Sequence, residues 1–173
     1  MCPSSTTGQA VFLGLDTFGD VTRRRTRRAA PPCVGAAQRR RRRIYRRALA
    51  ELHPGQPALP IGVHSPGFVF DTDEEAREIL FPHFKRNRDR IGRERGWPPS
   101  STADIAREAD SGALVVGSPV TVALKIAATV KALGARRFDL TYSNGPLPHE
   151  HLMRCIELYG TEVAPRVREL LPG

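Results

Sequence analysis

The feature that most constrains the fold is a basic window, Arg23–Arg47, which holds twelve arginines and no acidic residue. Arginine, alanine and proline dominate it, and as far as Arg43 its few apolar residues do not recur at a helical or a strand spacing. Clustered guanidinium groups repel one another and stay solvated, so we predict a disordered linker over residues 23–43. The part from Arg39 onward is able to join a following helix. The linker then separates an N-terminal segment, residues 1–22, from a C-terminal part, residues 44–173.

The net charge of +9 comes from this window alone, because acidic and basic residues nearly balance in the rest of the chain. The folded parts are therefore not basic in the way that a nucleic-acid-binding domain is. No aromatic residue within residues 23–43 is available to stack on bases, and Tyr45 is alone beyond them. These features argue against nucleic acid as the partner. An arginine-arm nucleic-acid-binding protein is kept as an alternative function.

Length and composition predict one ordinary domain with a buried core, since 40% of the 173 residues are hydrophobic. No apolar run reaches the roughly 18 residues of a membrane span, and no basic start precedes a long apolar segment. We therefore expect an untargeted, cytoplasmic protein with no membrane partner. Cys2, Cys33 and Cys155 lie far apart, so neither a disulfide framework nor a zinc site is indicated.

Strands and helices are predicted to alternate along the chain, which is typical of an α/β fold with a parallel sheet. Thr72 and Glu75 form a capping-box pattern, and Ser118-Pro119 has the pattern of an N-cap followed by a first helical position. Ala113–Val116 is an apolar stretch that we leave without assignment. The predicted strands are Gln9–Asp16, Leu59–Val69 and Arg137–Tyr142, and the predicted helices are Ile44–Leu52, Thr72–Arg95, Ser100–Ala109, Pro119–Leu133 and Pro148–Leu171.

Several separate motifs occur in a fixed order: LGLDTFGDVT over residues 13–22, GSP before KI in residues 117–126, RFDL over residues 137–140, and LPHE and IELYGTEVAP near the end. In this order they resemble the luciferase-like flavin-dependent oxidoreductases. The resemblance implies a TIM barrel and a monooxygenase that uses reduced flavin mononucleotide (FMN), or in other branches a deazaflavin. It also implies a small organic substrate and molecular oxygen as partners.

The resemblance does not extend over a whole barrel, which takes about 250 residues. It therefore implies a partial barrel that lacks its middle and retains strands resembling the first (Gln9–Asp16), the seventh (Leu59–Val69) and the eighth (Arg137–Tyr142), paired in the order 7-8-1. The change at Thr22 is abrupt, and Arg, Ala, Pro and Gly all have GC-rich codons. A frameshift or an internal deletion explains the basic window better than selection for an arginine arm.

Active sites of TIM barrels lie at the carboxyl ends of the strands. The resemblance therefore implies cofactor-binding positions at Asp16, Phe18, His64 and Ser143, with a loop beginning near His64. The acid/base residue would come from the missing strands, so we assign no catalytic residue.

Structural roles account for the same residues equally well. Asp16 is able to accept backbone N–H groups in a turn, and His64 fits a hydrogen-bonded structural histidine. Capping accounts for Ser118 without a bound phosphate. His149 and His151 do not have the spacing of metal ligands, so we predict no metal.

A partial barrel is expected to be marginally stable, inactive and weak in flavin binding, because its sheet edges are unpaired. Association with a second copy or with an intact paralogue, as a non-catalytic interaction fragment, is the other alternative function. We expect the following side chains to be partly bare on the inner face: Leu13, Leu15, Ile61, Val63, Phe138 and Leu140.

Overall fold

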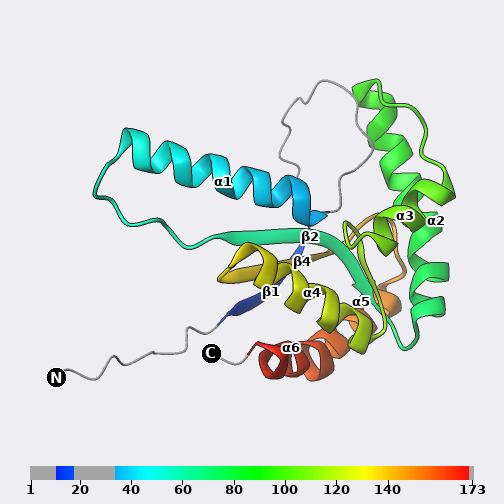
Figure 1. Cartoon of the computed structure of the whole chain (residues 1–173). Coiled ribbons are helices and arrows are strands. Elements are labelled where there is room, and N and C mark those ends of the chain that lie inside the picture. Colours follow the sequence, from blue (N-terminus) through cyan, green and yellow to red (C-terminus); the bar gives the residue numbers. More distant parts are fainter. Residues whose placement is uncertain (1–10, 18–33, 172–173) are drawn as a thin grey trace.

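The computed structural model describes residues 11–17 and 34–171 and shows an α/β fold with four parallel strands (Figure 1). The sheet has the order β1-β4-β2-β3. Its strands are β1 (Phe12–Thr17), β2 (Gly62–Val69), β3 (Val115–Gly117) and β4 (Arg137–Ser143). The helices are α1 (Val34–Leu52), α2 (Asp73–Arg95), α3 (Thr102–Asp110), α4 (Pro119–Leu133), α5 (His149–Leu158), the π-helix η1 (Tyr159–Val163) and α6 (Ala164–Leu170).

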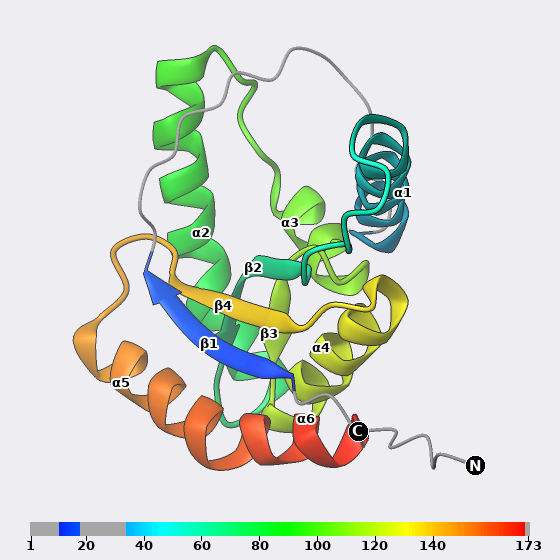
Figure 2. The ribbon, with the colours of Figure 1, turned by 90° about the vertical axis from the view of Figure 1, so that its left-hand side faces the viewer.

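The three predicted strands pair in the predicted order, since β4 lies between β1 and β2. The fourth strand, β3, is formed by the apolar stretch that the sequence left without assignment, and it pairs with Gly67–Val69 of β2. Helix α4 lies between α1 and α6 and contacts both of them (Figures 1 and 2).

Helix α1 corrects the expectation of a disordered linker for residues 34–43, because these residues form its first half. Arg42, Tyr45 and Ala48 recur at a helical spacing and are half-buried, whereas most of the arginines around them are exposed. One face of the helix therefore packs against α4, and the other keeps its guanidinium groups in solvent. The remainder of the predicted linker, residues 23–33, lies outside the described residues.

The alternation of side chains in the sheet also corrects the expected bare face. Phe138 and Leu140 of β4 are completely buried and belong to the same cluster as Leu158 and Val163 of the last helix. Leu13, Ile61 and Val63 are half-buried, while the side chain of Leu15 lies outside the described part. The apolar residues of these strands point toward the helices, so polar residues such as Asp139 occupy the other face.

Local sequence explains the helix ends. The Thr72 hydroxyl accepts the Glu75 N–H at 3.2 Å and donates to the Glu75 carboxylate, so the predicted N-cap of α2 is confirmed. Ser118 caps α4, as predicted. The predicted final helix contains a π turn, because Pro165 has no N–H to donate to the carbonyl four residues earlier. Ala164 instead donates to the Tyr159 carbonyl, five residues back.

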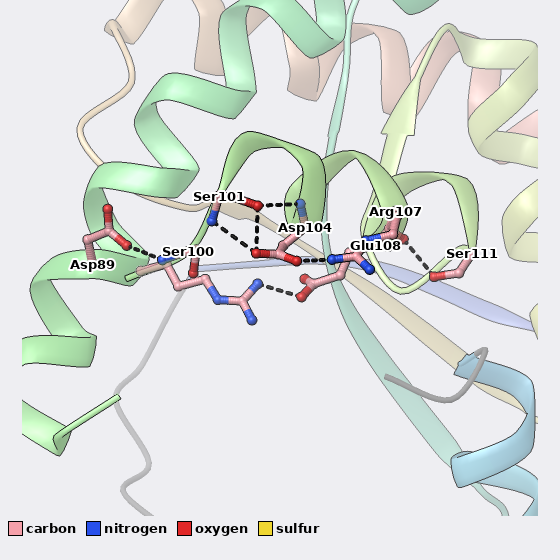
Figure 3. A network of polar contacts seen from close by, with 8 residues as sticks. Asp89, Ser100, Ser101, Asp104, Arg107, Glu108 and Ser111 are labelled. Carbon is pink, nitrogen blue, oxygen red and sulfur yellow. Dashed lines mark hydrogen bonds and ion pairs between the residues drawn. The ribbon is translucent and has the colours of Figure 1, made fainter. Parts of the chain in front are cut away.

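Helices α2 and α3 are joined by the polar network in Figure 3. Arg88 donates to the Glu108 carboxylate at 2.5 Å, and Asp89 accepts the Ser100 N–H at 2.9 Å. Ser101 and Asp104 form a complete capping box at the start of α3. This network fixes α3 on α2 close to β3, where Ile105 and Ala109 complete the core.

Candidate functional site at the carboxyl edge of the sheet

All four strands are parallel, so they end at one edge of the sheet, which we call the carboxyl edge. Ligands of open parallel sheets bind outside this edge. Two predicted site residues lie there. Asp16 is in register with Thr141, and the next residue, Thr17, is in register with Ser143. The structure therefore brings Asp16 and Ser143 onto neighbouring strands, while Phe18 lies outside the described residues.

His64 is not at the carboxyl edge. It is the third residue of β2, it is exposed, and it is in register with Asp139. Because Ser143 lies four residues beyond Asp139, His64 is about 13 Å nearer the amino ends of the strands. The prediction that a loop begins near His64 is wrong.

The strand continues past His64 because Pro66 is tolerated in β2. The Ile61 carbonyl accepts the Arg136 N–H at 2.8 Å, so odd-numbered residues of β2 bond to β4 and the Pro66 nitrogen faces the other way. On that side, pairing with β3 begins only at Gly67. The missing N–H of Pro66 therefore costs no ladder hydrogen bond.

The turn after β4 is well fixed against its surroundings. Asn144 is 2% exposed, and its side-chain amide donates to the Thr141 carbonyl. Gly145 has a φ of 108°, which favours glycine, and it lies against the backbone of His83 in α2. The sequence predicts a turn here but gives no signal that α2 supports it.

Two histidines near this edge contain buried ring nitrogens with no hydrogen-bond partner, namely Nδ1 of His83 and Nδ1 of His151. The ring of His151 meets the ring of Phe70 edge-on, with 5.5 Å between centroids, and Phe70 stacks on Phe68 at 5.9 Å. Sequence reasoning considered His151 only as a metal ligand and did not consider His83. Both nitrogens are enclosed by the described residues, so neither offers accessible surface to a ligand in this arrangement.

The N-terminus of α4 is occupied by the chain itself. The carboxylate of Asp73 accepts the Ser118 N–H at 2.6 Å and the Thr121 hydroxyl at 2.9 Å. Burial raises the pKa of Asp73, but the hydrogen bonds from Ser118 and Thr121 outweigh it and hold the pKa below its ordinary value. A bound phosphate would have to displace this carboxylate, so the capping interpretation of Ser118 holds.

Two buried titratable groups lie beneath the sheet in the last helix. The Cys155 sulfur accepts the Val69 N–H at 3.3 Å, and burial raises the pKa of this thiol to about 11. Burial, and secondarily the charge of Asp139, raises the pKa of the Tyr159 phenol. Both groups stay protonated at neutral pH, so neither supplies a nucleophile or a base.

The described residues do not enclose a flavin at the carboxyl edge. Cavities of about 310 and 520 Å³ open instead beside α1 and the amino half of β2. His64 lines the smaller cavity, away from Asp16 and Ser143. The donors at the start of α4 are already bonded to Asp73. A flavin-binding site here would need further residues to enclose the cofactor.

Within residues 11–17 and 34–171, no three histidine, cysteine, aspartate or glutamate side chains lie close enough to hold a metal ion. The same residues contain no helix that is both long and apolar enough to cross a membrane.

A scan against protein-family models gives no match, and neither does a search of curated proteins. Solved structures do match. The monooxygenase RslO1 from Streptomyces bottropensis aligns with a TM-score of 0.64 and 19% identity, over 78% of this chain and 40% of its own. The oxygenating constituent of 3,6-diketocamphane monooxygenase from the CAM plasmid of Pseudomonas putida is a type II Baeyer-Villiger monooxygenase solved in complex with FMN. It aligns with a TM-score of 0.53 and 26% identity, over 77% of this chain and 40% of its own. The chain therefore has the fold of a part of these monooxygenases, about two fifths of their length.

Proposed function

We propose that this chain forms one wall of a flavin-dependent monooxygenase site, as part of a TIM barrel that retains its first strand and its last strands. The observation that carries the proposal is the match to the FMN-bound monooxygenase over 77% of this chain. The parallel order β2-β4-β1 supports it, because strand eight of a closed barrel lies beside strand one.

In this proposal Asp16, Phe18 and Ser143 face the flavin or the substrate from the carboxyl edge, and the missing strands supply the other walls. His64 lies nearer the amino ends of the strands and lines the cavity beside α1, so it is not one of these residues. The cofactor is FMN, with a deazaflavin as the alternative, and the other reactants are a small organic substrate and molecular oxygen. The chain alone is expected to bind flavin weakly, because the described residues provide no closed pocket for an isoalloxazine ring.

The experiment is to complete the barrel with the missing middle segment of the 3,6-diketocamphane enzyme and to titrate the chimera with FMN. We expect the chimera to bind FMN and the original chain to bind it at least about tenfold more weakly, because enclosure supplies most of the contact area. Ser143→Ala is expected to weaken FMN binding about fivefold, which is the typical worth of one hydrogen bond. Ser100→Ala, in the α2–α3 connection, is the matched control and should change it less than about twofold.

A deazaflavin titrated in parallel distinguishes the two cofactors. Folded chimeras that bind neither FMN nor the deazaflavin would contradict the proposed function. Equal effects of Ser143→Ala and Ser100→Ala would contradict the role of Ser143.

A further inference from the structure

We propose that the cleft between α1 and the amino half of β2 binds a small organic anion, with a carboxylate or phosphate group on a short apolar body. This cleft is separate from the carboxyl edge, and the inference does not depend on the proposed function. It rests on the two cavities beside α1, on the charges of the residues that line them and on one buried guanidinium nitrogen.

The smaller cavity, of about 310 Å³, has a basic side and an apolar side. Arg41 and Arg42 come from α1 and His64 comes from β2, whereas Ile61, Val63 and Leu133 provide aliphatic surface. A volume near 300 Å³ is at the lower end of the range for small-molecule sites. The cavity therefore has the size for a small ligand with one charged end.

Tyr45 and Ile61 line both this cavity and the larger one, of about 520 Å³. The Tyr45 hydroxyl accepts the Leu59 N–H at 3.1 Å, which ties the segment before β2 to α1. Arg46 and Arg136 line the larger cavity. The two cavities are therefore neighbours with two shared lining residues, and we refer to them together as the cleft.

The charges in this cleft are not balanced by the described residues. None of the described residues that line the two cavities is acidic. The only acidic residue of α1, Glu51, pairs with Arg47 at 2.7 Å. Within the described part of the chain, Arg41, Arg42, Arg46 and Arg136 form no ion pair. Four guanidinium groups without a counter-charge favour an anionic occupant.

The position of Arg42 indicates where the anionic group of a ligand would bind. Its guanidinium lies against Gly134 at the C-terminus of α4, where the helix dipole favours a cation, so the side chain is held in place. Its Nε atom is nevertheless buried and has no hydrogen-bond acceptor within residues 11–17 and 34–171. A buried charged donor without an acceptor is costly, and an oxygen of a carboxylate or phosphate would satisfy it.

The shape of the site favours a small ligand over a nucleic-acid backbone. Arg40 and Arg43 are exposed on the same helix but line neither cavity, so the proposed site uses only some of the arginines. A polyanion would contact the exposed guanidinium groups along the helix without this selection. The aliphatic wall also has no function in phosphate-backbone binding.

The test is calorimetric titration of the full chain in phosphate-free buffer with phenyl phosphate, benzoate, inorganic phosphate and neutral benzyl alcohol. We expect one site for phenyl phosphate or benzoate, with inorganic phosphate and benzyl alcohol each at least about tenfold weaker. Arg42→Gln and Arg41→Gln should each weaken binding about tenfold, and Arg43→Gln, which removes the same charge outside the cleft, less than about twofold. Because Arg41 is exposed, its variant keeps the test valid if Arg42→Gln fails to fold.

Three results would overturn the proposal. The first is no binding of either aromatic anion at millimolar concentration. The second is equal loss of affinity in all three arginine variants, which indicates unspecific charge attraction. The third is binding of a single-stranded oligonucleotide that phenyl phosphate does not compete for, which would assign the arginines to a polyanion.

Discussion

The carboxylate of Asp73 connects two helices that begin far apart in sequence. Asp73 is the first residue of α2, and the groups that donate to it, the Ser118 N–H and the Thr121 hydroxyl, belong to the first turn of α4. Gly117 has a φ of 147° next to this carboxylate, and a side chain there would collide with Asp73 Oδ1. One side chain therefore sets the relative position of α2, β3 and α4.

We predict that Asp73→Asn lowers the free energy of unfolding by about 1–2 kcal/mol at neutral pH, through loss of a charged cap. The pKa of Asp73 in the folded chain lies below the ordinary 3.8. Its contribution is thus complete above about pH 4 and is lost as the pH falls through the folded-state pKa. Urea unfolding at pH 7 and pH 3 should show a smaller difference between variant and wild type at pH 3. Equal differences at both pH values would contradict the prediction.

Sequence reasoning found Ser118 as a cap because a cap is a local pattern. It did not find Asp73 as the partner, because the two residues are brought together only by the strand pairing of β2 with β3. Asp16 and Ser143 were placed at one edge because parallel strands end together. His64 was misplaced because the Ser-Pro-Gly that follows it has the composition of a turn and yet continues the strand.

A second prediction for a single residue concerns Gly14. Asp139 lies directly against it on the neighbouring strand, in the space that a side chain would occupy. Gly14→Ala should displace the Asp139 carboxylate and weaken its 2.7 Å ion pair with Arg137, with a loss of about 1–3 kcal/mol from overpacking. Thermal unfolding measures the loss. Gly160→Ala, which meets nothing nearby, is the matched control and should leave the midpoint unchanged or raise it.

Among the elements, α1 shows why an arginine-rich composition led to the wrong prediction of disorder for residues 34–43. Clustered arginines predict repulsion, but Arg42, Tyr45 and Ala48 share one helical face that packs on α4, and the other guanidinium groups reach solvent without being buried. We predict that Ala48→Pro, in the interior of α1, lowers stability by about 3 kcal/mol. Ala48→Ser is the control, with a loss below about 1 kcal/mol. A melting temperature unchanged by the proline would show that α1 does not support the fold.

The short strand β3 was not predicted because three residues are too few for a period to be visible. Its outer side is protected by Lys125, whose ammonium donates to the Val116 carbonyl at 2.9 Å and to the Ala109 carbonyl at 3.0 Å. Burial lowers the pKa of Lys125. We predict that Lys125→Met costs about 1–3 kcal/mol, because the Val116 carbonyl loses the ammonium donor and the Ala109 carbonyl keeps the Gly112 N–H but loses Lys125. Lys131→Met, on the exposed side of α4, should leave the urea midpoint within experimental error.

At the scale of the whole molecule, the order of the strands followed from the family resemblance, but the burial of the two sheet faces did not. The apolar residues of β4 were assigned to the barrel interior, whereas they point to the helices. A parallel strand needs its aliphatic side chains on the side that the helices cover. Other apolar residues of the strands are therefore exposed to solvent, for example Phe12, which is 71% exposed.

The pairing of β1 with β4 also determines when the sheet is completed. β1 is made before the other three described strands, and its partner β4 is made after β2 and β3, so β1 cannot pair with β4 until those strands have been synthesised. Closing so long a loop is entropically unfavourable and slow, whereas β2, β3 and β4 are neighbours in sequence and able to associate earlier. The newly made chain therefore passes through a stage in which one side of β4 is open to any extended segment, including the β1 of another copy.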